Sequence, residues 1–225
     1  MTLEDIIREI GELSVPNGKQ APDLKGYVNR AQRQIASRRN WSFMKAVNTA
    51  TIAANTNSVS LGSTFKSLAG ETSPASFTYG DYRLPVYVAS RQEIEARGIW
   101  PWVNGPYFTP SPGGAWPIRV VFLESTSAGW TLNIPPQFTP TIDVSFNVSA
   151  YYYPATLTLA SDTNAITEDG DLGEALVNKT RAISYAAIDP SDPKIAGAER
   201  LYETAITRAL YADASRQFSG RTLRM

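Results

Sequence analysis

The stretch from Leu24 to Phe43 places the strongest constraint on how this chain can fold. Its apolar residues recur every three or four positions, which puts them on one side of a helix: Leu24, Val28, Ala31 and Ile35. We expect this helix to run from about Ala21 to Arg39. Trp41 and Phe43 follow it as an aromatic anchor. The sequence therefore predicts an amphipathic helix that needs partners along its apolar side.

Helical patterns occur at both ends of the chain. Before the helix at Leu24, Thr2 can cap a first helix whose apolar side is Leu3, Ile6, Ile7, Ile10 and Leu13. A third helix, capped by Asp169 or Asp171, carries Leu172, Leu176, Ile183 and Ala187. A fourth, capped by Asp192, has an alanine-rich stripe made of Ala198, Leu201, Ala205, Ala209 and Ala212. Neither pair can bury its stripe alone, so the two pairs should pack together.

Between the helices the apolar pattern is typical of strands. Thr49–Ala53 and Ser58–Leu61 flank a polar Asn-Thr-Asn, which predicts a hairpin. Further strands are predicted at Tyr82–Val88, Ile118–Leu123, Trp130–Ile134 and Ile142–Tyr153. In the last of these, apolar and polar residues alternate, as in a half-buried antiparallel strand.

Other parts of this middle region favour loops. Gly62–Gly80 is rich in Ser, Thr and Gly and has little periodicity. Ser90–Glu93 resembles a capping box and predicts a short helix through Arg97. Ile99–Pro117 combines five prolines with three glycines, which predicts a loop, although it also holds several large aromatic residues.

These patterns predict an α+β fold: a discontinuous helical bundle of two N-terminal and two C-terminal helices, with an inserted antiparallel β-sheet or sandwich module. We assign residues 1–46 and 168–215 to the bundle and 47–167 to the β module. Residues 216–225 are expected to form an extended basic tail, since they show no helical face.

Composition excludes several classes of function. The chain has 225 residues, of which 43% are hydrophobic and 19% charged, as in ordinary globular proteins. Lys plus Arg and Asp plus Glu both number 21, and this balance argues against a free-standing nucleic-acid binder. There is no cysteine or histidine, which excludes thiolate chemistry and histidine metal sites. We expect no cofactor, no membrane span, and synthesis in the cytoplasm.

No catalytic motif is recognisable. Without histidine a nucleophile would need activation by Lys or a carboxylate, and neither Ser-x-x-Lys nor Gly-x-Ser-x-Gly occurs. An acidic cluster could in principle bind a cation, but its spacing differs from that of a calcium loop. It lies at the start of the third helix and comprises Glu168, Asp169, Asp171 and Glu174. We therefore interpret it as helix capping, and the protein as a non-enzyme.

Two surface features admit alternative interpretations. The tryptophans and the run Tyr151–Tyr153 could stack sugars or nucleic-acid bases, or simply divide between core and surface along a strand. Arg30, Arg33, Arg38 and Arg39 could form a solvated helix face or a polar interface with a neighbouring subunit. No basic residues interleave with the tyrosines, which favours their division between core and surface, but composition does not separate the two interpretations of the arginines.

Three segments resemble the head-to-tail adaptor proteins of tailed bacteriophages. Tyr27–Phe43 resembles the family's Asn-Arg-Ala helix, which ends in an Arg-rich turn followed by Trp and Phe. Leu132–Pro136 with Val148–Ala155 resembles its strand pair that ends in a Tyr-Tyr-x-x-Pro-like element. Leu172–Ala187 with Asp192–Ala212 is similar to its paired C-terminal helices. The resemblance does not extend across Gly62–Pro117.

This resemblance implies a structural virion protein in the neck of the particle. The family forms a non-enzymatic ring, usually a dodecamer, between the portal protein and the tail or neck proteins, and double-stranded DNA passes through its centre. It implies a portal-docking tail with Arg216, Phe218, Arg221, Leu223 and Arg224. It also favours a subunit interface at Arg30, Arg33, Arg38 and Arg39, and a bundle-to-β anchor at Trp41 and Phe43.

The aromatic loop is the segment for which the resemblance gives no counterpart. Under the adaptor hypothesis we expect it to contact tail or neck proteins through Trp100, Trp102, Tyr107 and Trp116. The alternative function is a β-rich module that binds carbohydrate or protein, carried on a helical stalk in a tail or collar accessory protein. A flat, exposed row of Trp and Tyr side chains would favour that alternative.

Overall fold

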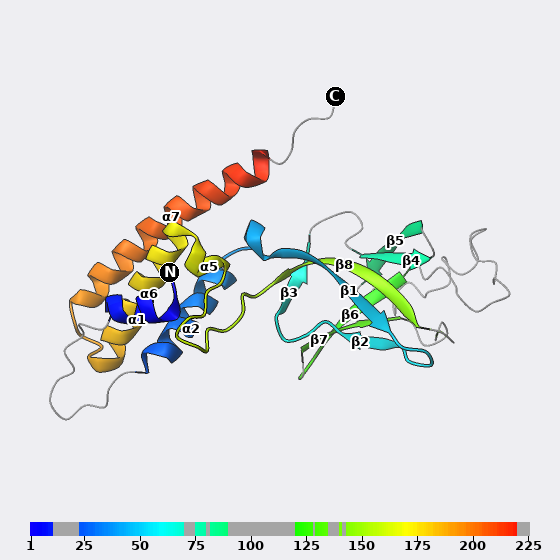
Figure 1. Cartoon of the computed structure of the whole chain (residues 1–225), viewed down its shortest axis with the longest axis horizontal. Helices are drawn as coiled ribbons and strands as arrows, with labels where there is room; N and C mark the ends of the chain where they lie inside the picture. The colour runs from blue at the N-terminus through cyan, green and yellow to red at the C-terminus, as the bar shows by residue number, and fades with distance from the viewer. Residues whose placement is uncertain are drawn as a thin grey trace. The chain divides into compact units, whose positions relative to one another are not determined.

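A computed structural model of the chain describes residues 1–10, 23–69, 75–79, 82–89, 120–127, 129–134, 140 and 143–219. The chain divides into two compact units. Met1–Met44 and Tyr153–Met225 form a helical unit, and Lys45–Tyr152 form a β unit. The β unit is thus inserted in sequence between two parts of the helical unit, and the fold is α+β, as predicted (Figure 1).

The described helices of the helical unit come from both ends of the chain. They are α1 (Leu3–Ile10), α2 (Leu24–Ser37), the 3-10 turn η1 (Ser42–Met44), α5 (Ala165–Glu168), α6 (Gly170–Ile188) and α7 (Lys194–Ser219). Thr2 caps α1, because its Oγ1 accepts a hydrogen bond from the Asp5 amide at 3.1 Å. Asp169 caps α6 and accepts from the Leu172 amide at 3.1 Å. Both caps agree with the predictions from sequence.

Helices α6 and α7 run side by side in opposite directions (Figure 1). Lys179, in the middle of α6, pairs with Glu199 of α7 at 2.7 Å, and Arg216, near the end of α7, pairs with Asp169, the cap of α6, at 3.0 Å. The core of this unit combines side chains from both ends of the chain: Leu3, Ile6, Ile10, Val28, Ile35, Leu172, Leu176, Tyr202 and Ile206. The predicted mutual burial of the two helical pairs is therefore observed.

The stripe predicted on α7 was partly wrong. Leu201 is 52% exposed, whereas the neighbouring Tyr202 and Ile206 are each 1% exposed. The buried face of α7 also includes the carboxylate-bearing Asp213, which is 2% exposed. Ala198, Ala205 and Ala209 of the predicted stripe are buried, but Tyr202 and Ile206 take the place of Leu201 on the buried face.

The segment 153–167, expected in the β module, groups with the helices instead. Asn29 on α2 holds it by a two-point clamp: its Nδ2 donates to the Leu157 carbonyl and its Oδ1 accepts from the Leu157 amide, both at 2.9 Å. Gln32, one turn further along, donates to the Ala155 carbonyl at 2.8 Å. Gln32 Oε1 in turn accepts from Asn164, the cap of α5, at 2.8 Å. These bonds satisfy backbone groups that no sheet partner satisfies.

The β unit contains eight described strands. They are β1 (Lys45–Ile52), β2 (Ser58–Ser60), β3 (Phe65–Leu68), β4 (Ala75–Tyr79), β5 (Tyr82–Ala89), β6 (Val120–Thr126), β7 (Gly129–Asn133) and β8 (Val144–Tyr152). They follow the order β1-β8-β4-β5-β6-β7-β2, with β3 also paired to β8. Strand β8 is central, because β1 lies along one edge of it and β3 and β4 lie along the other.

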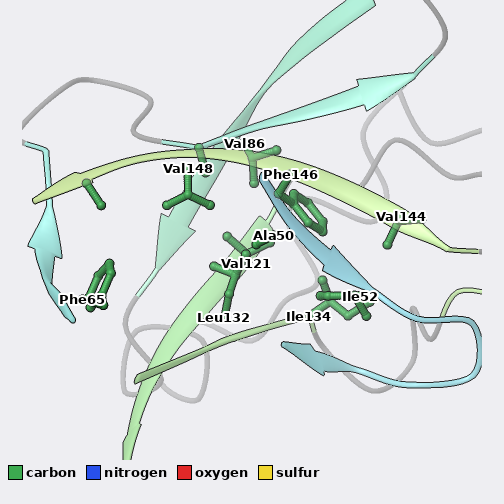
Figure 2. Close-up of a cluster of buried hydrophobic side chains, with 12 residues drawn as sticks. Ala50, Ile52, Phe65, Val86, Val121, Leu132, Ile134, Val144, Phe146 and Val148 are labelled. Carbon is green, nitrogen blue, oxygen red and sulfur yellow. The ribbon is translucent and has the colours of Figure 1, made fainter. Parts of the chain in front are cut away.

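The core of the β unit lies on one face of these strands. Val144, Phe146, Val148 and Ala150 of β8 alternate with polar residues and are buried. Figure 2 shows that Phe146 and Val148 point toward Val121 of β6 and Leu132 of β7. Tyr152 belongs to the same inward face and packs edge-on against Phe65, with ring centroids 5.9 Å apart.

Several predictions for the middle of the chain need correction. β1 and β2 do not form a hairpin, because β1 pairs with β8 and β2 pairs with β7. Gly62–Gly80 contains β3 and β4 rather than loop alone. β5 and β6 are parallel, which residues 90–119 permit, since a parallel crossover needs about a dozen residues or more. The short helix predicted at Ser90–Arg97 lies outside the described residues.

Replacing Asn29 by Ala tests the clamp on the segment after β8. The variant leaves the buried Leu157 amide and carbonyl unpaired, so we expect the free energy of unfolding to fall by about 1–3 kcal/mol. Urea denaturation followed by helical circular dichroism measures this change. Ser37→Ala is the matched control on α2, because that exposed hydroxyl donates only to its own helix. Equal midpoints for the two variants would contradict the clamp.

Replacing Phe146 by Ala tests the β core independently. A fully buried aromatic ring is lost, so we expect the β unit to be destabilised by about 3–5 kcal/mol. Amide hydrogen exchange with mass spectrometry should show faster exchange in β1 and β8 than in α6. The control is Ser145→Ala, which alters the neighbouring residue on the opposite strand face. Unchanged exchange in β8 of the Phe146 variant would show that this core assignment is wrong.

Candidate functional site

The residues from Arg38 to Met44 lie where the helical unit passes the chain to β1. Arg38 donates from Nη1 to Glu203 on α7 at 2.9 Å, and its second amino group also pairs with that carboxylate. The guanidinium lies over the Tyr202 ring, 5.0 Å from its centroid. The hydrogen bond to Glu203 raises the pKa of Arg38, and burial raises the pKa of the Tyr202 hydroxyl.

A buried carboxylate fixes the following residues. Asp213 on α7 accepts a hydrogen bond from the Ser42 amide at 3.0 Å and another from the Ser42 hydroxyl. Arg39 pairs with the same carboxylate at 3.2 Å, and the Asp213 side chain is only 3% exposed. The ion pair and the two hydrogen bonds offset the free-energy cost of burying the Asp213 carboxylate. Arg38–Ser42 is thus fastened to α7 at two places.

Trp41 and Phe43, predicted as the anchor, flank Ser42, which binds the Asp213 carboxylate. Trp41 is fully buried, and its indole N–H donates to the Ile35 carbonyl of α2 at 3.0 Å. The Phe43 ring stacks on Trp41 with ring centroids 6.0 Å apart. The Arg39 guanidinium lies over the Trp41 ring, 5.6 Å from its centroid. The indole is therefore a second donor to this carbonyl at the end of α2, which also accepts the backbone amide of Arg38 at 3.2 Å.

The four arginines predicted at a subunit interface fall into two pairs. Arg38 and Arg39 are both engaged with acidic residues of α7. Arg30 and Arg33 are exposed on α2. Arg33 lies over the Tyr153 ring, 5.5 Å from its centroid, and Arg30 has no hydrogen bond or ion pair with any of the described residues. The structure does not test whether these side chains contact another subunit.

The prediction of an extended tail from residue 216 is wrong for its first four residues. Helix α7 continues through Ser219, so residues 216–219 are helical rather than extended. Arg216 donates to Asp169 on α6 at 3.0 Å, which extends the paired region of the two helices. Its side chain nevertheless remains 59% exposed. Phe218 lies in the last turn of α7, whereas Arg221, Leu223 and Arg224 lie outside the described residues.

The acidic cluster at the start of α6 forms capping and ion-pair contacts. Besides the cap at Asp169, both Asp171 and Glu174 pair with Arg208 on α7, the former at 3.3 Å. Glu168 accepts a hydrogen bond from the Thr163 hydroxyl at 3.0 Å. Within the described ranges, no group of three or more acidic side chains is arranged to hold a metal ion. No helix of the described chain is long and apolar enough to cross a membrane.

The tyrosines after Ala150 do not form one row. Tyr152 points into the β core, and Tyr153, in the helical unit, stacks under Arg33. This arrangement matches the division between core and surface that alternation along a strand predicts. Trp100, Trp102, Tyr107 and Trp116 lie outside the described residues.

Sequence reasoning missed three side chains that organise the helical unit. Asn29 and Gln32 lie in the segment that resembles the adaptor family, and Asp213 lies in the alanine-rich helix, but no pattern in the sequence indicates their partners. A polar residue on the apolar side of a predicted helix indicates a buried polar group. Gln32 and Asp213 are such residues, with exposed fractions of 4% and 2%. Such residues need a partner from elsewhere in the chain.

Comparison with known proteins now adds to this geometry. No curated protein matches the chain. A family model described as SU10 adaptor protein matches residues 1–225. The match covers both parts of the helical unit and the inserted β unit. The chain therefore belongs to the SU10 adaptor protein family, which confirms its resemblance to bacteriophage head-to-tail adaptors.

Proposed function

We propose that this protein is the head-to-tail adaptor of a bacteriophage virion, forming a ring beneath the portal protein to which the tail attaches. The observation that carries the proposal is the match of the adaptor family model to the whole chain. An adaptor of this kind is a structural virion component, so no catalytic step is assigned to any residue. The ring would comprise about twelve copies, as the resemblance implies, and would assemble from chains made in the host cytoplasm.

The helical unit is the part best suited to form the ring. Its core joins helices from both chain ends, and ion pairs connect the first half of α6 to α7. We place the direct contact with a neighbouring subunit at Arg30 and Arg33, which project from α2. Arg38 and Arg39 would support that surface from behind, since both are bound to α7. Arg is enriched at protein interfaces, where it can hydrogen-bond and stack.

The charge balance of the chain suits passage of DNA through such a ring. Lys plus Arg and Asp plus Glu both number 21, giving a formal net charge of zero. A strongly basic channel would hold the phosphate backbone by releasing its counterions, and so would slow the movement of the genome. We infer that double-stranded DNA passes without sequence-specific binding.

Docking on the portal is assigned to the end of the chain. Helix α7 ends at Ser219, and Arg221, Leu223 and Arg224 follow it in the sequence. With Arg216 and Phe218 in the last turns of α7, they would supply cationic and apolar contacts. Trp100, Trp102, Tyr107 and Trp116 of the β unit are assigned to tail or neck proteins, because aromatic side chains dominate such contacts.

Reversing the charge of Arg30 and Arg33 tests the ring. We expect the Arg30→Glu, Arg33→Glu double variant to fold normally but to lose ring formation on portal-containing heads, as seen by negative-stain microscopy. Lys25→Glu with Lys194→Glu is the control, because it changes the net charge equally at helix starts, where acids are tolerated. Rings of normal size from the arginine variant would show that these residues are not at the interface.

Truncation tests portal docking separately. Removing Phe218–Met225 should abolish binding to portal-containing heads in a sedimentation assay, while the unfolding midpoint stays that of the intact chain. A full-length variant with Arg221→Ala, Leu223→Asp and Arg224→Ala should give the same loss, which distinguishes side-chain contacts from chain length. Tail joining by the truncated protein at normal efficiency would refute the assignment.

A further inference from the structure

Tyr211 is the most exposed large apolar side chain in the described part of the chain. It lies on the outer side of α7 and is 74% exposed. Apart from the hydrogen bonds of the helix backbone, it takes part in one hydrogen bond, in which its carbonyl accepts from the Ser215 hydroxyl at 3.0 Å. Within the described residues its ring and phenol therefore have no partner. Tyrosine combines a large apolar ring with a polar end, and such side chains are enriched where proteins meet.

The surface beside Tyr211, which we call the Tyr211 face, has a negative net charge. Glu168 accepts a hydrogen bond from the Thr163 hydroxyl at 3.0 Å but forms no ion pair with any described residue. At this surface four carboxylates face two guanidinium groups, which leaves a net charge of −2. Two cations of α7 are bound there by three carboxylates at the start of α6: Arg208 by Asp171 and Glu174, and Arg216 by Asp169.

The middle of α2 presents the opposite charge. Arg30 and Arg33 are exposed there, and α2 contains no acidic residue. Arg30 has no hydrogen bond or ion pair with any described residue. The Arg33 guanidinium lies over the Tyr153 ring and likewise forms no ion pair within the described ranges. This arginine face thus carries two guanidinium groups without a carboxylate to neutralise them.

The two faces belong to the same helical unit but cannot meet within one chain. Helix α6 packs against both α2 and α7. Val28 and Ile35 lie on the buried side of α2, whereas Arg30 and Arg33 are exposed on its other side. Tyr211 is likewise exposed on α7. The chain therefore carries both halves of a contact with complementary charge, and a second copy is needed to bring the halves together.

We propose that the arginine face of one copy binds the Tyr211 face of the next, so that neighbouring subunits of the ring meet through two different surfaces. This inference rests on the ring of the proposed function and names the partner surface of Arg30 and Arg33. Their guanidinium groups gain carboxylates at Glu168 and Glu174, and the Tyr211 ring gains a cation over its face. Because every copy keeps one surface of each kind, the contact repeats until the ring closes.

The absence of cysteine allows this pairing to be tested by cross-linking. Ser37 and Ser215 are exposed and lie one turn beyond Arg33 and Tyr211 on their helices. Ser37→Cys combined with Ser215→Cys in one chain, treated with a flexible bismaleimide on portal-containing heads, should give a ladder of covalent dimers, trimers and larger species. Each single variant should stay at 24.6 kDa, because its thiol meets no thiol of the next copy.

The single variants also identify other occupants of the Tyr211 face. A covalent dimer from Ser215→Cys alone would show that two copies meet through like surfaces. A cross-link from that variant to the portal protein would show that the portal covers this face. A ladder that appears only after removal of Phe218–Met225 would show that the chain's own end covers it. Each of these three results overturns the proposal.

Exchanging charges tests which side chains face each other. Glu168→Arg should raise the protein concentration that half-saturates the heads with rings by about tenfold, as should Arg30→Glu. Both changes in one chain should restore ring formation, because every contact regains a pair of opposite charges. The matched control is Glu4→Arg, which reverses an exposed acid on α1 that has no ion pair among the described residues. Circular dichroism melts of each variant check that it folds, and Glu168→Gln replaces any arginine variant that does not.

Truncating the tyrosine separates this inference from the ring itself. Tyr211→Ala should impair ring formation, whereas Leu201→Ala, an exposed apolar residue about 15 Å away on the same helix, should not. If Arg30→Glu prevents ring formation but Glu168→Arg and Tyr211→Ala do not, the ring stands and only its partner surface is wrong. If the unmodified chain forms no ring on portal-containing heads, the proposed function and this inference both fail.

Discussion

The hydrogen bonds between Asn29 and the backbone of Leu157 are the interaction on which the rest of the helical unit depends. When the chain leaves β8, its peptide groups lose their sheet partner and still need to be satisfied inside the protein. A side-chain amide offers one donor and one acceptor at the spacing of a peptide, so Asn29 replaces a neighbouring strand for one residue. Gln32 continues the pairing at Ala155 and connects it to the cap of α5.

The same helix also controls how the chain enters the β unit. At the end of α2, the Trp41 indole donates a hydrogen bond to the Ile35 carbonyl. Ser42 and Arg39 bind the buried carboxylate of Asp213. The chain therefore enters and leaves the inserted unit from residues fixed to a single helical framework. This explains how an insertion as large as Lys45–Tyr152 can interrupt the bundle without separating its two parts.

The sequence predicted the helical framework well because its information is local. The spacing of Val28, Ala31 and Ile35 identified the buried side of α2, and Thr2 and Asp169 marked helix starts by their position alone. The sequence failed where partners come from far along the chain. The strand Thr49–Ala53 looks like half of a hairpin, but its neighbour is β8, about a hundred residues later. The burial of Asp213 could not be predicted from the sequence, because its partners Ser42 and Arg39 lie far away along the chain.

The distance in sequence between Asn29 and Leu157, 128 positions, has a consequence for biosynthesis. Helices α1 and α2 are synthesised before the β unit, yet α6, against which both helices pack, is synthesised after it. The β unit is continuous in sequence and needs nothing from the later residues for its own core. The nascent chain must therefore carry two uncovered amphipathic helices through the synthesis of a whole sheet, and the helical unit can close only after the residues that follow Tyr152 have been made.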